Sequence, residues 1–322
     1  MYNWLMPGVD IFKKMLASGR VPHAVLLTVA RGLGGGQLAF ELARRYLCLE
    51  QGSEDCTCRS CVYMSASTHP DYYIVGSDDK SSIGIEDVRL GIRALDDTAA
   101  NNHGKVLYIE GAERMTVPAA NALLKTLEEP PLGSLIILTT GSLQALLPTI
   151  ISRCMRVTIP QPNPKMLNDF LCQELKTNEN YDLELAVLGW SPLKVLACVQ
   201  KKEHELIREG VQQACDAIVG KNSPTTVATF FDKKLTEPEQ VYGILYSLIK
   251  EGLAYQSGVP ATHLCLLKHR TDVLEALAKI SPVSLSQALN RILALRQVPS
   301  IKTSYVNMLQ LVSWFTLLSN AR

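Results

Sequence analysis

A glycine-rich segment that includes Gly32 lies between an apolar run and a helical pattern, where a phosphate-binding loop is typically found. Such a loop, of pattern G-x-x-x-x-G-K-[ST], holds phosphates on backbone N–H groups and a lysine, and holds Mg²⁺ through its hydroxyl. In that register Gly34 keeps the second glycine, but Val29 replaces the first. Gly35 and Gly36 stand where the lysine and the hydroxyl residue belong. The loop is therefore degenerate, and we expect this chain to have no ATPase activity of its own.

A second part of a nucleotide site would be a pair of acidic residues after a buried strand, one binding Mg²⁺ and one polarising water. The apolar run that ends at Ile109 is followed by Glu110, which has the chemistry to hold a metal ion. Gly111 occupies the place of the second acid. The glycine loop and the acidic strand end together indicate a nucleotide-binding fold that has lost the ability to hydrolyse ATP.

A short polar step, Ser152 and Arg153, precedes another β-rich run. An arginine in such a loop has two interpretations. It is either a solvated charge or surface ion pair, or an arginine finger whose planar, permanently charged fork stabilises a transferring phosphoryl group.

Four of the nine cysteines cluster in one short segment, at Cys48, Cys56, Cys58 and Cys61. In a reducing compartment such a cluster favours a metal over disulfides, and four thiolates suffice for a closed tetrahedral zinc site. The alternatives are unliganded thiols, or a mixed site that recruits His69 or Asp55. The single residue between the second and third cysteines makes the spacing tight.

Short apolar runs alternate with helical patterns between about residues 20 and 160, which predicts a parallel sheet with crossover helices. The expected strands are Ala24–Val29, Tyr72–Val75, Val106–Ile109, Leu135–Thr139 and Arg156–Ile159. A helix is expected from Leu38 to Leu47 after the glycine loop, and Val88, Ile92 and Leu95 mark the face of another.

A helix is also predicted from Val117 to Glu129, where Pro130 ends it. Its last turn carries Glu128 and Glu129, although negative charge is unfavourable at a helix C-terminus. The pair indicates either a functional or partner contact, or a local ion pair between Lys125 and Glu129.

Proline residues from Pro160 to Pro164 predict a linker, and the patterns beyond it are helical. The expected helices are 166–176, 183–188, 192–200, 203–219, 238–253, 272–280, 284–295 and 305–319. A second break is expected near Gly220. The charge-free stretch from Thr303 to Ala321 carries a polar stripe, so we interpret it as a buried or partner-facing helix and not a membrane span.

The charges nearly cancel, with 32 Lys and Arg against 31 Asp and Glu, so no global field directs the chain to nucleic acid or membranes. The first ten residues lack the charged and apolar regions of a secretion signal. A cytoplasmic location is therefore expected.

Four segments together resemble the clamp-loader branch of the AAA+ ATPases, a family that includes subunits of bacterial DNA polymerase III. The segments are Thr68–Asp71, Ile83–Glu86, Asn121–Pro131 and Ser152–Cys154. Within this family the gamma/tau subunits share the cysteine cluster and the Ser-Arg-Cys step but keep an intact phosphate loop. The degenerate loop thus indicates a member that does not hydrolyse ATP.

The resemblance implies an α/β AAA+ domain over 1–160 with an inserted zinc module, a small helical lid over 161–208 and an all-α collar over 209–322. It implies that Arg153 acts in trans on ATP held by a neighbouring gamma/tau subunit, and that the four clustered cysteines bind zinc. The family places two residues between the second and third cysteines, where this chain has only Thr57. Leu193 stands where active relatives carry a nucleotide-sensing arginine.

The implied partners are the gamma/tau ATPase subunits, a delta subunit, the sliding clamp and primed DNA, in a hetero-oligomer that acts in DNA replication. Two other functions stay open. One is a weakly active ATPase of the gamma/tau type that binds nucleotide through backbone N–H groups alone. The other is a zinc-bearing regulator that binds DNA, although the sequence shows no basic stripe or base-reading helix.

Overall fold

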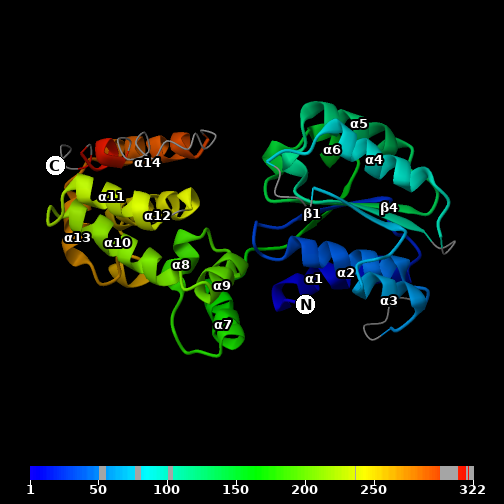
Figure 1. Ribbon diagram of the computed structural model, residues 1–322, viewed down its shortest axis with the longest axis horizontal. Helices are drawn as coiled ribbons and strands as arrows, with labels where there is room; N and C mark the ends of the chain where they lie inside the picture. The colour runs from blue at the N-terminus through cyan, green and yellow to red at the C-terminus, as the bar shows by residue number, and fades with distance from the viewer. Residues whose placement is uncertain are drawn as a thin grey trace. The chain divides into compact units, whose positions relative to one another are not determined.

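The chain folds into two compact units, Met1–Pro162 and Asn163–Arg322 (Figure 1). The computed structural model describes residues 1–50, 56–76, 81–100, 104–235, 237–297, 311–316 and 318. The first unit combines a sheet with helices, and the regular elements described in the second are helices. The boundary between the units lies inside the proline-rich segment expected to be a linker.

The centre of the first unit is a five-stranded sheet in which every pair of neighbours is parallel. The strand order is β2-β3-β4-β1-β5, with bounds β1 Ala24–Thr28, β2 Tyr72–Val75, β3 Lys105–Ile109, β4 Ser134–Thr140 and β5 Met155–Thr158. All five predicted strands are confirmed to within one residue at each end. The interior strand β1 pairs on both sides, so that Leu26 lies between Leu138 and Arg156. A buried position of this kind accounts for its continuous apolar run.

Helices cover both faces of this sheet, with α1, α2 and α3 on one face and α4, α5 and α6 on the other (Figure 1). Their bounds are α1 Met6–Ala17, α2 Gly35–Leu47, α3 Arg59–Ser65, α4 Ile85–Asp96, α5 Val117–Glu128 and α6 Pro148–Ile151. Under α4 and α5, Val88, Leu95, Leu123 and Leu127 are buried in a core with the sheet side chains. The predicted helical face of α4 and the predicted span of α5 are thus confirmed.

The start of α5 follows from its sequence. The Thr116 hydroxyl accepts the N–H of Ala119 at 3.4 Å, and Pro118 lies in the first turn, where its missing N–H has no partner to lose. The helix ends at Glu128, one residue before the predicted end, and Pro130 follows. Helix α5 therefore carries the carboxylate of Glu128 at its C-terminal end.

The predicted linker is shorter than expected, because Pro164 is the first residue of α7 (Pro164–Leu175). The side chain of Asn163 caps this helix by accepting the N–H of Met166 at 2.7 Å. A proline at the first helical position costs no hydrogen bond, so the inclusion of Pro164 in the linker was wrong.

The second unit is a helical assembly in which α12 packs against α8, α10, α13 and α14. The remaining bounds are α8 Asp182–Val187, α9 Pro192–Gln200, α10 His204–Ile218, α11 Pro224–Lys234, α12 Pro238–Gln256, α13 Thr271–Ala278 and α14 Pro282–Gln297. Gly243 of α12 lies against the end of α8 so closely that a Cβ there would be 2.0 Å from the Val187 carbonyl oxygen. The division of this unit into a lid and a collar stays a prediction.

Most predicted helices of the second unit are confirmed, but α11 was missed because the sequence around Pro224 was interpreted as a break. Ser223 caps α11 by accepting the N–H of Thr226, the same start signal that α5 and α7 show. Residues 311–316 and 318 are helical, and the rest of the predicted helix 305–319 lies outside the described residues.

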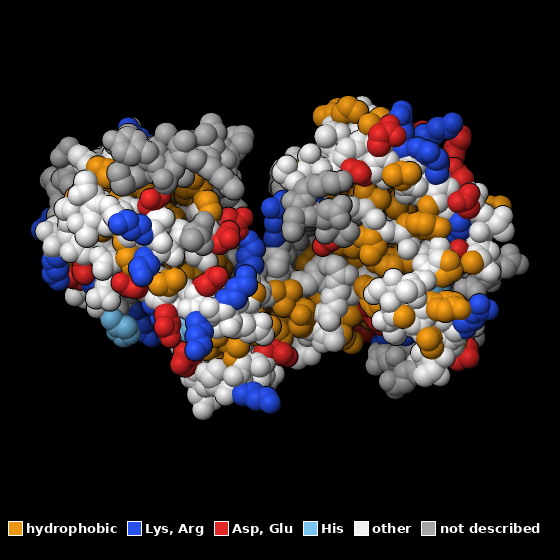
Figure 2. All heavy atoms as spheres, in the orientation of Figure 1, with side chains coloured by type: hydrophobic (Ala, Val, Ile, Leu, Met, Phe, Trp, Pro, Cys, Tyr) orange, Lys and Arg blue, Asp and Glu red, His pale blue; other side chains and the backbone are white. Residues whose placement is uncertain are grey.

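Charged side chains of both signs are interspersed over the face drawn in Figure 2, in keeping with the nearly balanced composition. Among the described residues, no helix combines the length and the apolar character that crossing a membrane requires.

Candidate functional site

The degenerate glycine loop connects β1 to α2, so the fold places it where a phosphate-binding loop belongs. Gly34 is the N-cap of α2 with φ +85°, and Gly32 has φ +77°, both in the region that favours glycine. The helix begins at Gly35, three residues before the predicted Leu38. The two glycines that replace the lysine and the hydroxyl residue therefore form the first turn of α2.

Aromatic side chains from the N-terminal segment lie against this loop. A Cβ on Gly34 would be 2.8 Å from the Tyr2 ring, and the Trp4 indole N–H donates to the Leu33 carbonyl oxygen at 2.8 Å. The Tyr2 and Trp4 rings stack with centroids 5.0 Å apart. Trp4 is buried, so it is a packing residue. The position of Tyr2 could not be predicted from the sequence, because it depends on how the chain folds.

Gly36 stands where a phosphate-binding loop has its hydroxyl residue, and it lies close to the carboxylate of Glu110. A Cβ on Gly36 would be 3.4 Å from Glu110 Oε1 and 3.5 Å from the Tyr108 hydroxyl. A carboxylate at this place repels an anionic phosphate unless a cation lies between them. The strand end and the loop do meet as predicted.

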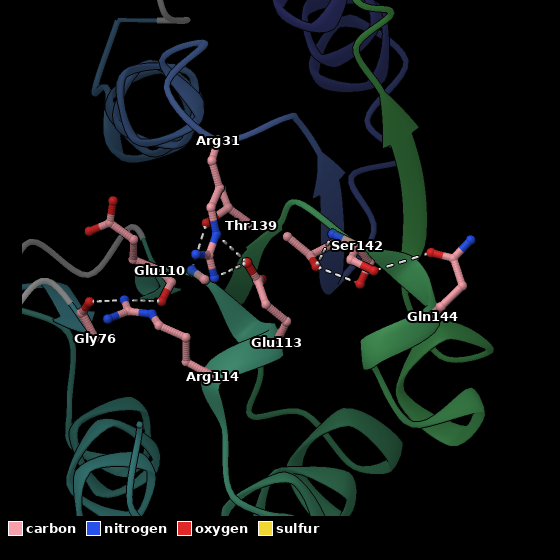
Figure 3. A network of polar contacts seen from close by, with 10 residues as sticks. Arg31, Gly76, Glu110, Glu113, Arg114, Thr139, Ser142 and Gln144 are labelled. Carbon is pink, nitrogen blue, oxygen red and sulfur yellow. Dashed lines mark hydrogen bonds and ion pairs between the residues drawn. The ribbon is translucent and has the colours of Figure 1, made fainter. Parts of the chain in front are cut away.

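The polar groups around this edge of the sheet bind one another (Figure 3). Arg31 of the glycine loop donates from Nε and Nη2 to Glu113 Oε1 at 3.3 and 3.2 Å. Arg114 donates to the Glu110 carbonyl oxygen at 2.8 Å and to that of Gly76. The Thr139 hydroxyl accepts the Gly111 N–H at 3.1 Å.

The network ties the strand ends and the loop together, and the sequence analysis missed Arg31, Glu113 and Thr139. These residues come from separate segments, and the parallel sheet brings them together because its strands end along one edge.

Arg153 lies in the turn between α6 and β5, where 34% of its side chain is exposed. Its Nη1 donates to the Thr149 carbonyl oxygen at 3.0 Å and to the Ser152 hydroxyl at 3.4 Å. Its Nη2 forms an ion pair with Glu128 Oε1 at 2.6 Å. The arginine is thus half-exposed and held from two helices.

The ion pair answers one question that the sequence left open. Glu128, at the C-terminus of α5, contacts Arg153, which lies far away in the sequence. Lys125 and Glu129 form no ion pair with each other among the described residues, so the local alternative is wrong. The partner of Glu128 is therefore Arg153, which is itself a candidate functional residue.

The four clustered cysteine sulfurs lie within 4.8 Å of one another. The Sγ atom of Cys48 is 3.5 Å from that of Cys56 and 3.9 Å from that of Cys58. Zinc–sulfur bonds of about 2.3 Å in a tetrahedron place sulfurs about 3.8 Å apart. The donor set therefore has the size and chemistry of a closed metal site, despite the tight spacing around Thr57.

The surroundings act differently on the thiols of the cluster. Burial raises the pKa of the Cys61 thiol, and at Cys56 the effect of the Cys58 N–H is outweighed by burial and the neighbouring thiols, which raise the pKa to about 11. Arg44 Nη1 lies 3.6 Å from Cys61 Sγ. Burial opposes ionisation of Cys58, but N–H donors from Cys61 and Leu49 outweigh it and lower the pKa of this thiol to about 6. A thiolate is the form that binds metal.

His69 supports the cluster from outside and is not part of the donor set. Its Nδ1 accepts the Asp71 N–H at 3.0 Å and its Nε2 contacts the Ser60 hydroxyl at 2.9 Å, which in turn donates to the Leu47 carbonyl oxygen at 2.7 Å. Leu47 and Ser60 are chain neighbours of Cys48 and Cys61. The mixed site with His69 is therefore wrong, and Asp55 lies outside the described residues.

The strand order, the glycine loop at the start of α2 and helices on both faces define an α/β fold of the AAA+ type whose glycine loop lacks a lysine. A gamma-subunit-related protein of DNA polymerase III from Thermotoga maritima shares the fold, with a TM-score of 0.51, 19% identity and coverage of 97% of this chain and 98% of the other.

Sequence comparisons identify the family within that class. A family model described as "DNA polymerase III, delta subunit" matches residues 7–163. The delta-prime subunit of DNA polymerase III from Haemophilus influenzae is 33% identical over 261 residues, which cover 80% of both chains. The one from Escherichia coli is 36% identical over 206 residues, covering 62% of this chain and 61% of that one. The chain belongs to the family of delta-prime subunits of DNA polymerase III, and it is therefore a component of a multi-subunit assembly.

Proposed function

We propose that this chain is a non-catalytic subunit of a clamp loader, which completes an ATP site on a neighbouring subunit through Arg153. The observation that carries the proposal is the contrast between the chain's own phosphate loop and Arg153. The chain's own phosphate loop lacks the lysine and is packed against Tyr2 and Trp4. Arg153, by contrast, lies in an exposed turn, and its Nε donates to none of the described residues.

The neighbours that fit this role are gamma/tau ATPase subunits, together with a delta subunit, the sliding clamp and primed DNA. This assignment rests on family membership and on the resemblance in the Ser-Arg-Cys step, with Ser152 capping the turn that presents Arg153. The domains that would carry it are an AAA+ domain over 1–160, a lid over 161–208 and a collar over 209–322 that joins the subunits. A replication role would place the protein in the cytoplasm.

We infer further that the cysteine cluster binds one structural zinc ion. Four thiols at tetrahedral spacing, an adjacent arginine and the Ser60–His69 support favour a closed site. A closed site has no open position for water, so zinc would stabilise the α2–α3 connection and take no part in ATP hydrolysis.

The test is reconstitution of the assembly from gamma/tau, delta and this chain, with clamp-dependent ATP hydrolysis as the readout. We expect the isolated chain to show no ATPase activity. We expect clamp-dependent ATP hydrolysis by the assembly to require this chain. Arg153→Ala is expected to preserve assembly, measured by gel filtration, while slowing ATP turnover. Unchanged turnover in that variant would contradict the finger role, and hydrolysis by the chain alone would favour the weakly active ATPase.

The alternative of a DNA-binding regulator has its own test. It requires tight, salt-sensitive binding of duplex DNA by the isolated chain. The interspersed charges in Figure 2 give no support to it.

A further inference from the structure

The guanidinium of Arg153 is held between two helices that are distant in sequence. From its own turn, the Thr149 carbonyl oxygen and the Ser152 hydroxyl contact Nη1. From the end of α5, Glu128 contacts Nη2 at 2.6 Å. The group is thus fixed on two sides before any neighbouring subunit is present.

The position of Glu128 is unfavourable for its own helix. A carboxylate in the last turn of α5 lies near the negative end of the helix dipole. The positive charge of Arg153 offsets this cost at Glu128. Glu129, which is exposed in the same place one residue later, makes no ion pair among the described residues. Of the two glutamates, only Glu128 therefore forms an ion pair with Arg153 among the described residues.

The way in which Glu128 makes its contact leaves the Nε donor of the guanidinium available. Arginine binds phosphate and carboxylate best through two adjacent N–H groups. Arg31 uses such an edge, Nε with Nη2, for Glu113. Glu128 takes only Nη2 of Arg153, and Nε of Arg153 donates to none of the described residues. A carboxylate at Nη2 orients the guanidinium and leaves the Nε donor for an incoming phosphate.

We propose that Glu128 is a positioning residue for Arg153, and that it holds the guanidinium in the orientation in which its Nε donor meets the phosphate of a neighbouring subunit's ATP. This inference rests on the proposed function of Arg153. A long, flexible side chain that is oriented in advance reaches the transition state without a further loss of freedom, so the effect falls on the chemical step.

The experiment replaces Glu128 in the reconstituted assembly and separates kcat from KM for ATP. Glu128→Gln keeps the size of the side chain and removes its charge. Because the pair is half-exposed, we expect kcat at the served site to fall about two- to fivefold with KM unchanged. Glu129→Gln makes the same charge change one residue away and is expected to have no effect. Equal melting temperatures of the free variants check that both remain folded.

A double variant shows whether the effect passes through Arg153. In an Arg153→Ala background, Glu128→Gln is expected to cause no further loss. Turnover that is unchanged or higher in Glu128→Gln, or an additional loss in the double variant, would overturn the positioning role. If Arg153→Ala itself leaves turnover unchanged, the proposed function and this inference both fail. If Arg153→Ala slows turnover and Glu128→Gln does not, only the inference fails.

Discussion

Two arginines of the first unit, Arg31 and Arg153, are each paired with a glutamate, and they differ in the edge of the guanidinium that the glutamate uses. Arg31 is the more exposed of the two, 66% against 34%, yet its Nε and Nη2 both bind Glu113. Arg153 gives only Nη2 to Glu128. The two arginines therefore differ not only in exposure but also in whether Nε is already bound.

The largest expected effect tests this contrast directly. Arg153→Ala is expected to slow ATP turnover at the served site by on the order of 10³-fold, as loss of a finger supplied in trans does elsewhere. Arg31→Ala is expected to change turnover by less than about fivefold, because an ion pair with one exposed partner contributes about 1 kcal/mol or less. ATP hydrolysis by the reconstituted assembly measures both. A loss in Arg31→Ala as large as that in Arg153→Ala would remove the distinction.

The cysteine cluster is expected to be independent of both arginines. Cys58→Ser should abolish zinc binding, while His69→Gln should weaken it about 10- to 100-fold because the support of the ligand helices is lost. Metal analysis and chelator competition measure the two effects. Cys172→Ser, at a cysteine outside the cluster, is the control and should retain about one zinc per chain. Full zinc content in Cys58→Ser would contradict the assignment.

A smaller effect is expected from the packing that closes the glycine loop. Gly34→Ala places a Cβ 2.8 Å from the Tyr2 ring at a residue with φ +85°. Gly19→Ala is the matched control, because Gly19 has φ +65° but no atom within 4 Å of the Cβ position. We expect Gly19→Ala to lower the free energy of unfolding by about 1–2 kcal/mol through backbone strain alone.

Gly34→Ala should cost about 1–3 kcal/mol more than Gly19→Ala, since the ring must move. Tyr2→Ala should remove that difference in the double variant. Chemical denaturation measures all of these free energies. Equal losses in the two glycine variants would show that Tyr2 does not close the loop.

The smallest effect is expected at a third arginine, Arg270 of the second unit, whose Nε and Nη2 both bind Asp272 at 2.9 and 3.1 Å. The hydrogen bond from Arg270 lowers the pKa of Asp272 to about 2. A lowered pKa in the folded state stabilises the fold above the ordinary aspartate pKa of about 3.9, and this contribution is lost as the pH falls toward 2.

Asp272→Asn should therefore cost less than about 1 kcal/mol at neutral pH, since the pair is exposed, and nothing near pH 2. Stability curves of both chains at several pH values measure this difference. A constant difference across the range would mean that Asp272 acts through packing and not through charge.

Much of the fold could be predicted from the sequence because local patterns carry it. Buried parallel strands are continuous apolar runs, so all five strands were found, and the helical pattern from Val117 gave the start of α5. The failures were also local. Pro164 looked like part of a linker, although a proline suits the first helical position, and α11 was hidden behind Ser223 and Pro224, which start a helix as well as end one.

The sequence by itself determined which chemistry is missing, since a loop without a lysine and an acid followed by Gly111 cannot be repaired by folding. It also determined the set of four cysteines and singled out Arg153 and the glutamates of α5. Only the tertiary structure decided that Tyr2 lies on Gly34, that Arg31 is bound by Glu113 and that Glu128 contacts Arg153. These contacts join residues far apart in the chain. Arg31 and Glu113 meet at the edge of the parallel sheet where β1 and β3 end, whereas Glu128 and Arg153 meet at the opposite edge, where α5 ends and β5 begins.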